Sequence, residues 1–424
     1  MQTIREAEYV IGELVRELNP ERRVREILEK QKTSFKGRRI HVLSIGKAAW
    51  DMADAAWKEL GDVIQQGIVI TKYHHSKGEI GNFEIFEAGH PVPDEMSVKA
   101  AGRAVQAFGN LDADDLILFL ISGGGSALFE IPIDGFEIEN TAEVTEIMLK
   151  SGWDIKVVNS IRKRLSTVKA GQFADIVKPA QVRAYIISDV IGDEVEDIAS
   201  GPVSPVSERN ADFLKKTDSL DLSLFDSLKK REVFLESLKR ELPETAENAQ
   251  TFIIDNVSHA CAVAAEKARQ LGYHTRVITS HLECEASEAA RFICSIVKEV
   301  YSAHTAYSLP CCLIFGGETT VRIKGDGLGG RNQEIALTAA IELKDRAEDI
   351  TLFSFGTDGT DGPTDAAGGI VTSQTWSEMA EKGLSPEKHL LNNDSYHALK
   401  SVGGLIMTGP TGTNVNDVIC VLMR

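Results

Sequence analysis

The 424-residue sequence predicts an α/β fold divided into two domains. Apolar runs of strand length alternate along the chain with segments that have the apolar periodicity of amphipathic helices. Several of these runs end in a glycine-rich turn before the next helix, as strands of a helix-covered sheet do. The length is sufficient for two or three domains with separate cores.

The composition excludes several classes of protein. There are 46 lysines and arginines against 63 aspartates and glutamates, a formal charge of −17, so no nucleic-acid or anionic-membrane partner is expected. No apolar run approaches the roughly 20 residues of a membrane span. Residues 1–18 have the pattern of an amphipathic helix and not of a signal peptide. Six cysteines without a CxxC pair indicate reduced core residues of a cytoplasmic protein.

The first predicted strand-turn-helix unit carries a lysine in its turn. Ile40–Ile45 has the pattern of a strand, Gly46 and Lys47 follow, and a helix is predicted over Ala48–Leu60. Amides at the start of a helix are unpaired and the dipole end there is positive. We therefore expect Lys47 to join these amides in binding an anion, and a surface lysine is the alternative.

Two further strands, Ile68–Thr71 and Phe83–Ala88, precede a proline-containing loop, Gly89–Ser97. Asp94 in this loop is a natural N-cap for the helix that follows. His90 either approaches a ligand or only braces the turn.

The strongest ligand-binding pattern follows the buried strand Leu116–Ile121. The strand leads into a turn in which two serines flank three glycines: Ser122, Gly123, Gly124, Gly125 and Ser126. Consecutive glycine amides can form a concave nest, and Ser126 is expected to cap the next helix. The turn is therefore predicted to hold a phosphate or carboxylate, and a tight structural turn is the alternative.

A basic segment, Asn159–Gly171, is predicted to be helical. Arg162 and Lys169 are seven residues apart and would share one face of the helix. That face suits an anion-binding wall, and a charged surface helix is the alternative. Lys163 and Arg164 project elsewhere and are expected to be solvated.

A strand over Val182–Ser188 ends in Asp189, and Asp193 follows it. A carboxylate at the carboxyl end of a sheet strand lies where open α/β folds bind ligands. Asp189 and Asp193 are therefore candidates for a magnesium shell or for the base that activates a hydroxyl.

The composition changes between about Ser204 and Asn248, where short, charge-rich helices are predicted. We place the domain boundary there, which gives domains over residues 1–245 and 246–424. A second series of strands and helices then begins: strand Thr251–Ile254, helix Ser258–Leu271, strand His274–Thr279 and helix Ser287–Ala303.

A second glycine-rich stretch contains two predicted strands, Cys311–Phe315 and Thr320–Ile323, and a GxGxxG pattern over residues 325–330. The pattern lacks the parallel βαβ context and the acidic residue about 20 positions on that mark a dinucleotide fingerprint. Arg331 lies just past the last glycine, beside the start of a helix predicted over Asn332–Leu343, where a guanidinium can bind a phosphate or carboxylate through two N–H groups.

A third glycine-rich loop, Gly356–Gly369, follows a strand over Thr351–Phe355. Its aspartates, Asp358, Asp361 and Asp365, suit either a hydrated Mg²⁺ or turns capped by side chains. The chain closes with a glycine-rich segment that contains Asn414, and with a strand over Val418–Met423.

These features together favour phosphoryl transfer. The sequence has no P-loop, protein-kinase motif or nucleophile elbow. It has glycine nests, carboxylates at strand ends, and cations beside turns at Lys47, Arg162, Lys169 and Arg331. Such groups bind phosphate oxygens and offset the charge of a phosphoryl-transfer transition state.

Long motifs in a fixed order run through nearly the whole chain: GKAAW (46–50), GHPVPDE (89–95), LISGGGSALFE (120–130), ISDVIGDEVEDIASGP (187–202), GGET (316–319), GGRNQE (329–334), GTDGTDGPTDAAGG (356–369) and GPTGTNVND (409–417). They closely resemble the glycerate 2-kinase family with the MOFRL domain. The resemblance implies phosphorylation of D-glycerate by ATP to 2-phosphoglycerate, with Mg²⁺. It also implies a larger Rossmann-like N-terminal domain, a smaller α/β C-terminal domain of the MOFRL type, and an active site in the cleft between them.

By position, the active-site lysine and arginine of the family correspond to Lys47 and Arg331. From motif chemistry we expect Asp189 to act in catalysis, and a set of residues to bind substrate or phosphate: Ser122, Gly123, Gly124, Gly125, Ser126, Arg162, Lys169 and Asn332. The positions expected to bind nucleotide are Gly316, Gly317, Glu318, Gly329, Gly330 and Asn414, and those expected to bind metal are Asp189, Asp193 and Asp358. The sequence departs from the family pattern at Arg164, where a histidine is expected, and at Ala170, where a glycine is expected.

The expected partners are D-glycerate and ATP, for a monomer or a homodimer. An NAD(P)-dependent hydroxypyruvate reductase is the alternative, because the family has carried that label and both activities involve three-carbon acids. The missing acidic residue after Gly330 argues against it. A non-catalytic sugar-acid sensor would need clustered charge or an added binding domain, and the sequence has neither.

Overall fold

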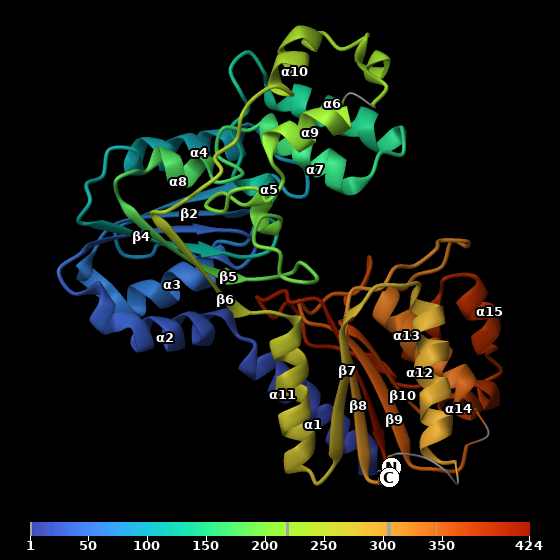
Figure 1. Cartoon of the computed structure of the whole chain (residues 1–424). Coiled ribbons are helices and arrows are strands. Elements are labelled where there is room, and N and C mark those ends of the chain that lie inside the picture. The colour runs from blue at the N-terminus through green and yellow to red at the C-terminus, as the bar shows by residue number, and fades with distance from the viewer. Residues whose placement is uncertain (1, 218–219, 303–306, 345) are drawn as a thin grey trace. The chain divides into compact units, whose positions relative to one another are not determined.

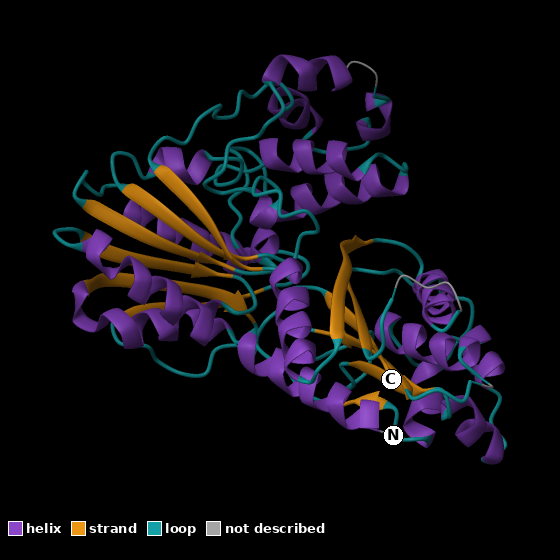
Figure 2. Ribbon diagram, turned by 60° about the horizontal axis from the view of Figure 1, so that its bottom comes forward, coloured by secondary structure: helices purple, strands orange, loops and turns teal. Residues whose placement is uncertain are grey.

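A computed structural model describes residues 2–217, 220–302, 307–344 and 346–424. The chain forms two compact units (Figure 1). The N-terminal unit comprises Pro20–Ser188 and Asp193–Ile254, and the C-terminal unit comprises Met1–Asn19, Asp189–Gly192 and Asp255–Arg424. Both contain a sheet with helices packed on it, which confirms the predicted two-part α/β fold (Figure 2).

The N-terminal unit is built on a six-stranded sheet in the order β3-β2-β1-β4-β5-β6. Strands β1 to β5 pair in parallel. The strand order reverses between β1 and β4, and the carboxyl ends of strands at such a switch point border the crevice where Rossmann-like folds bind ligands. The strands are β1 (Arg39–Ile45), β2 (Ile64–Lys72), β3 (Phe83–Ala88), β4 (Asp115–Ile121), β5 (Gln181–Ile187) and β6 (Ala249–Asp255).

Helices cover both faces of this sheet (Figure 1). On one face lie α2 (Pro20–Gln31) and α3 (Ala49–Leu60), and on the other α4 (Glu95–Phe108) and α8 (Gln172–Ile176). As predicted, Asp94 is the N-cap of α4, and its side chain accepts from the amide of Ser97 at 3.0 Å. Short helices complete the layer: η1 (Lys32–Phe35), η2 (Gly61–Val63), α5 (Gly125–Leu128) and η3 (Ile198–Ser200).

A helical cluster formed by the segments after β4 and after β5 has a core of its own. Its aromatic centre is Phe213, Phe225 and Phe234, all at most 1% exposed. Its members are α6 (Ile138–Lys150), α7 (Ile155–Arg164), α9 (Asn210–Thr217), η4 (Leu222–Phe225) and α10 (Arg231–Ser237). The prediction that Lys163 and Arg164 are solvated is wrong: Lys163 pairs with Asp197 at 3.0 Å, and the Arg164 guanidinium lies 3.4 Å from the centre of the Phe213 ring.

The C-terminal unit is built on a mixed sheet in the order β11-β10-β9-β12-β8-β7. Strand β12 runs antiparallel to both β8 and β9, so its first residue lies at the edge where those two strands end. The strands are β7 (His274–Leu282), β8 (Cys311–Gly317), β9 (Ile350–Gly356), β10 (Gly368–Thr372), β11 (Leu405–Ile406) and β12 (Asp417–Met423).

Two helices, α1 (Gln2–Glu17) and α11 (Val257–Gln270), pack on one face of this mixed sheet, and the other helices lie on the opposite face (Figure 1). The second group consists of α12 (Ala286–Val300), α13 (Arg331–Glu342), α14 (Thr375–Glu381), α15 (Pro386–Leu391) and α16 (Ser395–Ser401). Helix α1 joins the C-terminal unit because its apolar stripe, with Val10 and Leu14 at most 1% exposed, packs against α11.

The compact units differ from the expected division at residue 245 in two respects. The strand expected to open the second domain is β6, which is hydrogen-bonded to β5 in the N-terminal sheet. Residues before Pro20 belong to the C-terminal unit. A predicted strand over Thr320–Ile323 is absent from the described residues, where Thr320 forms only an isolated bridge with Glu285.

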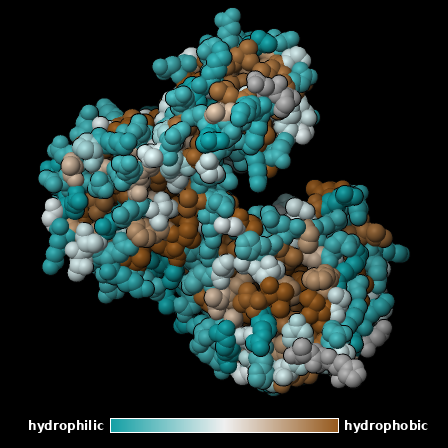
Figure 3. Space-filling model, viewed as in Figure 1, coloured by the Kyte–Doolittle hydropathy of each residue, from teal (hydrophilic) through white to brown (hydrophobic). Residues whose placement is uncertain are grey.

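Surface and membrane features are modest. Among the described residues no helix combines the length and the apolar character that a bilayer crossing requires. All six cysteines are free, and all except Cys284 are buried, largely as predicted. Hydrophobic side chains reach the surface near the edge strand β7, where Val277 and Ile278 are exposed (Figure 3).

Candidate functional site

Two turns meet at the switch point of the N-terminal sheet. The turn after β1 contains Gly46, whose φ is +115° and at which a Cβ would lie 2.3 Å from Ser122 Oγ. The Ser122 hydroxyl accepts from the amide of Ala48 at 3.0 Å, and the Ser122 amide donates to the carbonyl of Ile45 at 3.0 Å. Ser122, which we expected to bind phosphate, therefore uses its own polar groups to join the turns after β1 and β4.

The glycines after Ser122 form a turn with unused amides. The Gly123 carbonyl accepts from the amide of Lys47 at 2.9 Å, and Gly124, at φ +89°, is the N-cap of α5. Ser126 lies inside α5, so the prediction that it is the N-cap is wrong. Among the described residues nothing accepts a hydrogen bond from the amides of residues 123–126. We call residues 123–126 the nest, because consecutive unpaired amides can converge on an anion.

Lys47 lies beside the nest. Its Cγ is 3.4 Å from the position that a Cβ on Gly124 would take, and its side chain is half-buried. Its carbonyl accepts from His75 Nδ1 at 3.1 Å, which fixes the backbone of the turn. Within the described part of the chain, no carboxylate lies within ion-pair distance of the Lys47 ammonium. An uncommitted cation next to uncommitted amides is suited to binding an anion.

Lys169 and Arg162 differ from the prediction and from each other. Helix α7 ends at Arg164, so the two residues do not share a helix face. Lys169 is 1% exposed and forms an ion pair with Glu130, and burial lowers its pKa despite that partner. Arg162 is half-buried, its charge acts on Lys169, and its guanidinium has no hydrogen-bond or ion-pair partner among the described side chains. Arg162 is therefore the member of the pair that is available to a ligand.

Ala170 has a backbone conformation that favours glycine, the residue that we expected at this position. Its φ is +54°, in the left-handed region that favours glycine, and its amide donates to the carbonyl of Ser200 at 3.0 Å. Ser200 in turn shares a hydrogen bond of 2.9 Å between its Oγ and that of Ser126. These contacts connect the nest to the segment that carries Lys169.

The three aspartates expected to bind metal do not form one shell. Asp189 belongs to the C-terminal unit, where its carbonyl accepts from Asn416 Nδ2 at 3.0 Å, and Asp193 belongs to the N-terminal unit. Asp358 accepts from the amide and the hydroxyl of Thr360, as in a side-chain-capped turn. Across the described ranges no three histidine, cysteine or acidic side chains are grouped so that they could hold a metal ion. The metal-binding role of these three aspartates therefore stays a prediction.

Arg331 is the first residue of α13 and is held by two carboxylates. Its Nε and Nη2 donate to the two carboxylate oxygens of Asp417 at 2.6 and 3.0 Å, and Nη1 lies 3.0 Å from Glu318 Oε1. Asp417 is the buried first residue of β12, and burial raises its pKa to about 6 against the lowering effect of Arg331. The two N–H groups of Arg331 that we expected to bind a ligand anion therefore bind Asp417 within the protein.

The neighbours of Arg331 complete a rigid network. Asn332 is 1% exposed, and its amide donates to Asp361 Oδ1 at 3.1 Å. Asp361 also accepts from the amide of Gln333 at 2.8 Å, so it caps the start of α13, and burial raises its pKa. Asn416, at φ +63°, donates to Glu318 Oε2 at 3.1 Å and accepts an amide at its own backbone carbonyl. Sequence reasoning missed Asp417 and Asn416 as partners, because they lie far along the chain from Arg331 and Glu318.

The glycines predicted for nucleotide binding contact the chain itself. A Cβ on Gly316 would lie 2.5 Å from Cys261 Sγ, and one on Gly317 would lie 2.3 Å from the Leu282 carbonyl oxygen. Gly329 and Gly330 are equally close to Ser395 and Asp361. Asn414 accepts from the amide of Asn416 at 3.2 Å, and Glu318 is 46% exposed at its side chain.

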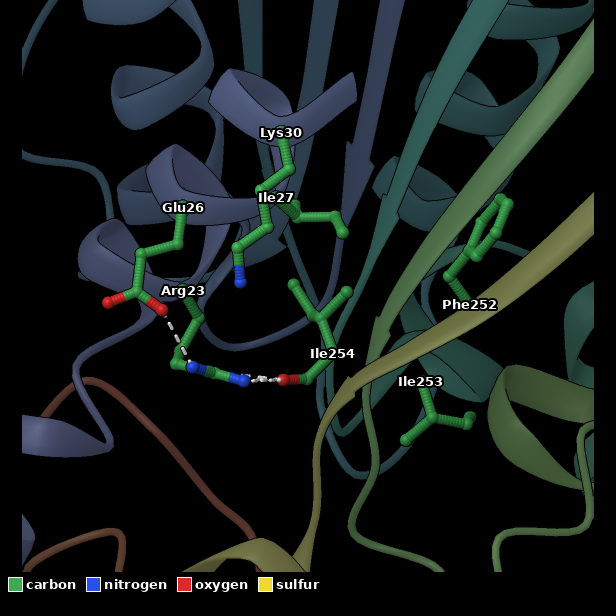
Figure 4. A pocket seen from close by; sticks show the side chains of 7 residues that line it. All are labelled: Arg23, Glu26, Ile27, Lys30, Phe252, Ile253 and Ile254. Atoms are coloured by element: carbon green, nitrogen blue, oxygen red, sulfur yellow. Dashed lines mark hydrogen bonds and ion pairs between the residues drawn. The ribbon is translucent and has the colours of Figure 1, made fainter. Parts of the chain in front are cut away.

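A cavity of about 300 Å³ lies elsewhere in the N-terminal unit, between α2 and β6 (Figure 4). The Arg23 guanidinium in it turns toward the Ile254 carbonyl, to which its Nη2 donates at 2.6 Å, and pairs with Glu26 at 2.8 Å. None of the predicted site residues lines this cavity. Its lining is Arg23, Glu26, Ile27, Lys30, Phe252, Ile253 and Ile254.

Comparison with known proteins places the chain in a family. A model described as a domain of unknown function, DUF4147, matches residues 6–231, and the model of the MOFRL family matches residues 311–417. The D-glycerate 2-kinase of Thermotoga maritima is 46% identical over 98% of this chain and 97% of its own length. The glycerate 2-kinase of Pyrococcus horikoshii is 40% identical over 98% of this chain and 96% of its own.

A solved structure agrees with these matches. The crystal structure of a glycerate kinase from Thermotoga maritima has a TM-score of 0.93 to this chain, at 44% identity and with full coverage of both chains. The extended matches, the strand order at the switch point and the motif order lead to the same assignment. The chain belongs to the glycerate 2-kinase family with the MOFRL domain.

Proposed function

We propose that this protein is an ATP-dependent kinase that transfers the γ-phosphoryl group of ATP to the 2-hydroxyl of D-glycerate, giving 2-phosphoglycerate and ADP. The observation that carries the proposal is the nest beside Lys47, at the switch point of a chain in the glycerate 2-kinase family. Neither the amides of the nest nor the Lys47 ammonium has a partner among the described residues. Unpaired amides and an ammonium are the groups that bind phosphoryl oxygens as negative charge develops on them.

Each step of the transfer needs a group in a defined place. The 2-hydroxyl oxygen attacks the γ-phosphorus, and the bond from that phosphorus to the β–γ bridging oxygen breaks. Lys47 and the amides of the nest would bind the oxygens of the transferring group. The hydroxyl proton passes to a carboxylate, for which we propose Asp189. This residue lies just after the carboxyl end of β5.

Arg162 is our proposal for the group that binds the glycerate carboxylate. Its guanidinium has no partner among the described side chains, and a bidentate Arg–carboxylate contact orients a small acid well. The buried pair of Lys169 and Glu130 lies beside it and would hold this wall in place. In this proposal Lys169 supports the site without contacting substrate.

In the C-terminal unit, Arg331 and the positions predicted for nucleotide are proposed to contact ATP. Arg331 is held in one orientation by Asp417, which suits a cation that must be positioned before the reaction begins. Among the positions predicted to bind nucleotide, Glu318 has an exposed side chain that a ligand can reach. Mg²⁺ is proposed to enter as its complex with ATP, because Mg²⁺ is usually bound through one or two carboxylates together with the phosphates of the substrate.

The remaining assignments are also proposals. We propose that the protein acts in the cytoplasm, as a monomer or a homodimer; the free cysteines favour a reducing compartment. Light scattering coupled to size-exclusion chromatography measures the oligomeric state.

The test is release of ADP by the purified full-length chain supplied with ATP, Mg²⁺ and D-glycerate. We expect ADP release that depends on D-glycerate and is absent without it. Oxidation of NADH with hydroxypyruvate, in the absence of ADP release, would instead support the reductase alternative. The glycine positions of the GxGxxG pattern contact residues 392–395 and Asp361, which disfavours that outcome.

A further inference from the structure

His90 is a polar side chain at the site that the proposed roles leave unused. It follows β3 closely, and its ring lies over the nest: a Cβ on Gly124 would be 2.8 Å from His90 Cδ2 and 2.9 Å from Nε2. The ring is half-buried, and no described residue exchanges a hydrogen bond with either ring nitrogen. An imidazole that stands against unpaired amides without a partner of its own is placed to contact whatever the amides bind.

The groups that face His90 are basic. They are Lys47 from the turn after β1, Lys72 at the end of β2, and His75 from the loop after β2. The nearby carboxylates are committed elsewhere: Glu87 accepts from the amides of His75 and Ser76, and Asp94 from the hydroxyl of Tyr73. Burial, and then the charge of Lys47, lower the pKa of His90 to about 4. At neutral pH the ring is therefore uncharged, with one N–H to donate.

We propose that His90 is a substrate-contacting residue that donates a hydrogen bond from its neutral ring to an oxygen of the anion held in the nest. The inference rests on the proposed kinase function for the identity of that anion, which in that proposal is the transferring phosphoryl group. A neutral donor adds a contact beside Lys47 without adding a second positive charge there. The same geometry explains Gly124, because any side chain at that position would displace the ring.

The test compares two substitutions of His90 in the full-length chain. His90→Gln keeps an N–H donor at a similar distance, and His90→Leu keeps bulk without a donor. We expect His90→Leu to lower kcat/KM at least tenfold, and His90→Gln to stay within about threefold of wild type. A fall in kcat with unchanged KM would support a contact to the transferring phosphoryl group, and a rise in KM for D-glycerate with unchanged kcat would contradict it.

A further measurement keeps the inference independent of activity. Binding of inorganic phosphate by calorimetry should weaken about tenfold in His90→Leu and little in His90→Gln, even if ADP release fails and the kinase proposal falls. His274→Leu, the same change at an exposed edge-strand residue of the C-terminal unit, is the matched control and should leave both readouts unchanged.

Several results would overturn the inference. One is unchanged phosphate affinity and unchanged kinetics in His90→Leu. Another is an equal defect in both variants with unchanged melting temperatures, which would assign a packing role. A third is a limb near pH 6.5 in the wild-type profile of kcat/KM that is lost in His90→Gln, because a neutral donor with a pKa of about 4 predicts matching profiles between pH 6 and 8.

Discussion

The nest at residues 123–126 and the GxGxxG pattern at residues 325–330 are both glycine-rich turns before a helix, and they use glycine for different reasons. In the nest, the amides have no partner in the described chain and Lys47 stands beside them. In the GxGxxG pattern, the glycines let another segment of the same chain approach. A Cβ on Gly325 would lie 2.3 Å from Asn392 Oδ1, and one on Gly327 would lie 2.5 Å from the Asn392 carbonyl.

A glycine-rich pattern therefore indicates that some group lies close to the backbone, but not whether that group is a ligand or another segment of the chain. Residues 392–394 hold the second turn through direct hydrogen bonds, such as the Gly327 amide to the Asn392 carbonyl at 2.9 Å and the Leu328 amide to Asp394 Oδ1 at 3.1 Å. These bonds use amides that a dinucleotide pyrophosphate would need. The nest differs from the GxGxxG turn in its amides and in Lys47, which have no partner among the described residues; the glycines are common to both turns.

The largest predicted effect concerns Lys47, the cation beside the nest. We expect Lys47→Ala to lower kcat by about a thousandfold or more, because it removes the ammonium that offsets developing charge. The melting temperature should change little, since the side chain has no ion pair in the described chain. Lys77→Ala, which removes an exposed lysine paired with Asp51, is the control. A Lys47→Ala variant with wild-type turnover would remove the functional distinction between the two turns.

One glycine from each turn sharpens the comparison. Gly124→Ala should lower activity about a hundredfold, because its Cβ would displace the His90 ring, with a drop of a few degrees in melting temperature from its positive φ. Gly327→Ala should lower the melting temperature by roughly 4–10 °C, because the clash is with backbone, and should leave kcat near wild type in folded protein. Calorimetry and the ADP assay measure both. The distinction between the two turns would be contradicted if Gly124→Ala and Gly327→Ala lost activity and melting temperature in the same proportion.

Substitutions of Arg162 and Lys169 test which of the two cations contacts substrate. Arg162 has no partner among the described side chains, whereas Lys169 is paired with Glu130. We expect Arg162→Ala to raise KM for D-glycerate by about tenfold to a hundredfold, and KM for ATP by little, because a bidentate carboxylate contact is lost. Arg162→Lys should recover part of the loss. Lys169→Met, by contrast, should act mainly on stability, since it leaves Glu130 buried without its partner. A larger KM effect in Lys169→Met than in Arg162→Ala would reverse the proposed roles.

The smallest expected effect is a pH dependence at Asp417. Burial raises its pKa to about 6 in the folded chain, above the roughly 3.9 of an unfolded aspartate. Its contribution to stability is therefore fully present below about pH 4 and is lost as the pH rises through about 6. The melting temperature of wild type relative to Asp417→Asn should fall by a few degrees between pH 5 and 7.5. A difference that stays constant with pH would show that Asp417 does not titrate in this range.

The sequence predicted local features well. Strands β4 and β8, the starts of α3 and α13, and the Asp94 cap follow from periodicity and turn chemistry within a few residues of chain. The position of Lys47 beside the glycine turn also follows, because parallel strands bring their carboxyl ends to one edge of a sheet.

Long-range pairing could not be predicted in the same way. Glu130 lies 39 residues from Lys169 and Asp417 lies 86 residues from Arg331, so nothing in the local pattern indicates that these cations are already paired. The same limit applies to β6, because its apolar pattern indicates a strand but not which sheet it joins. Helix α7 ends early although the spacing of its basic residues continues, since periodicity alone does not mark a helix end.

The central claim is that the nest and Lys47 support phosphorylation of D-glycerate at its 2-hydroxyl. The most direct test supplies the full-length chain with ATP, Mg²⁺ and D-glycerate, and couples the product to enolase without phosphoglycerate mutase. We predict a signal from wild type that Lys47→Ala abolishes, because enolase accepts 2-phosphoglycerate directly. A signal that requires added mutase would place the phosphoryl group on the 3-hydroxyl and contradict the claim. An undiminished signal from Lys47→Ala would contradict the role of the nest.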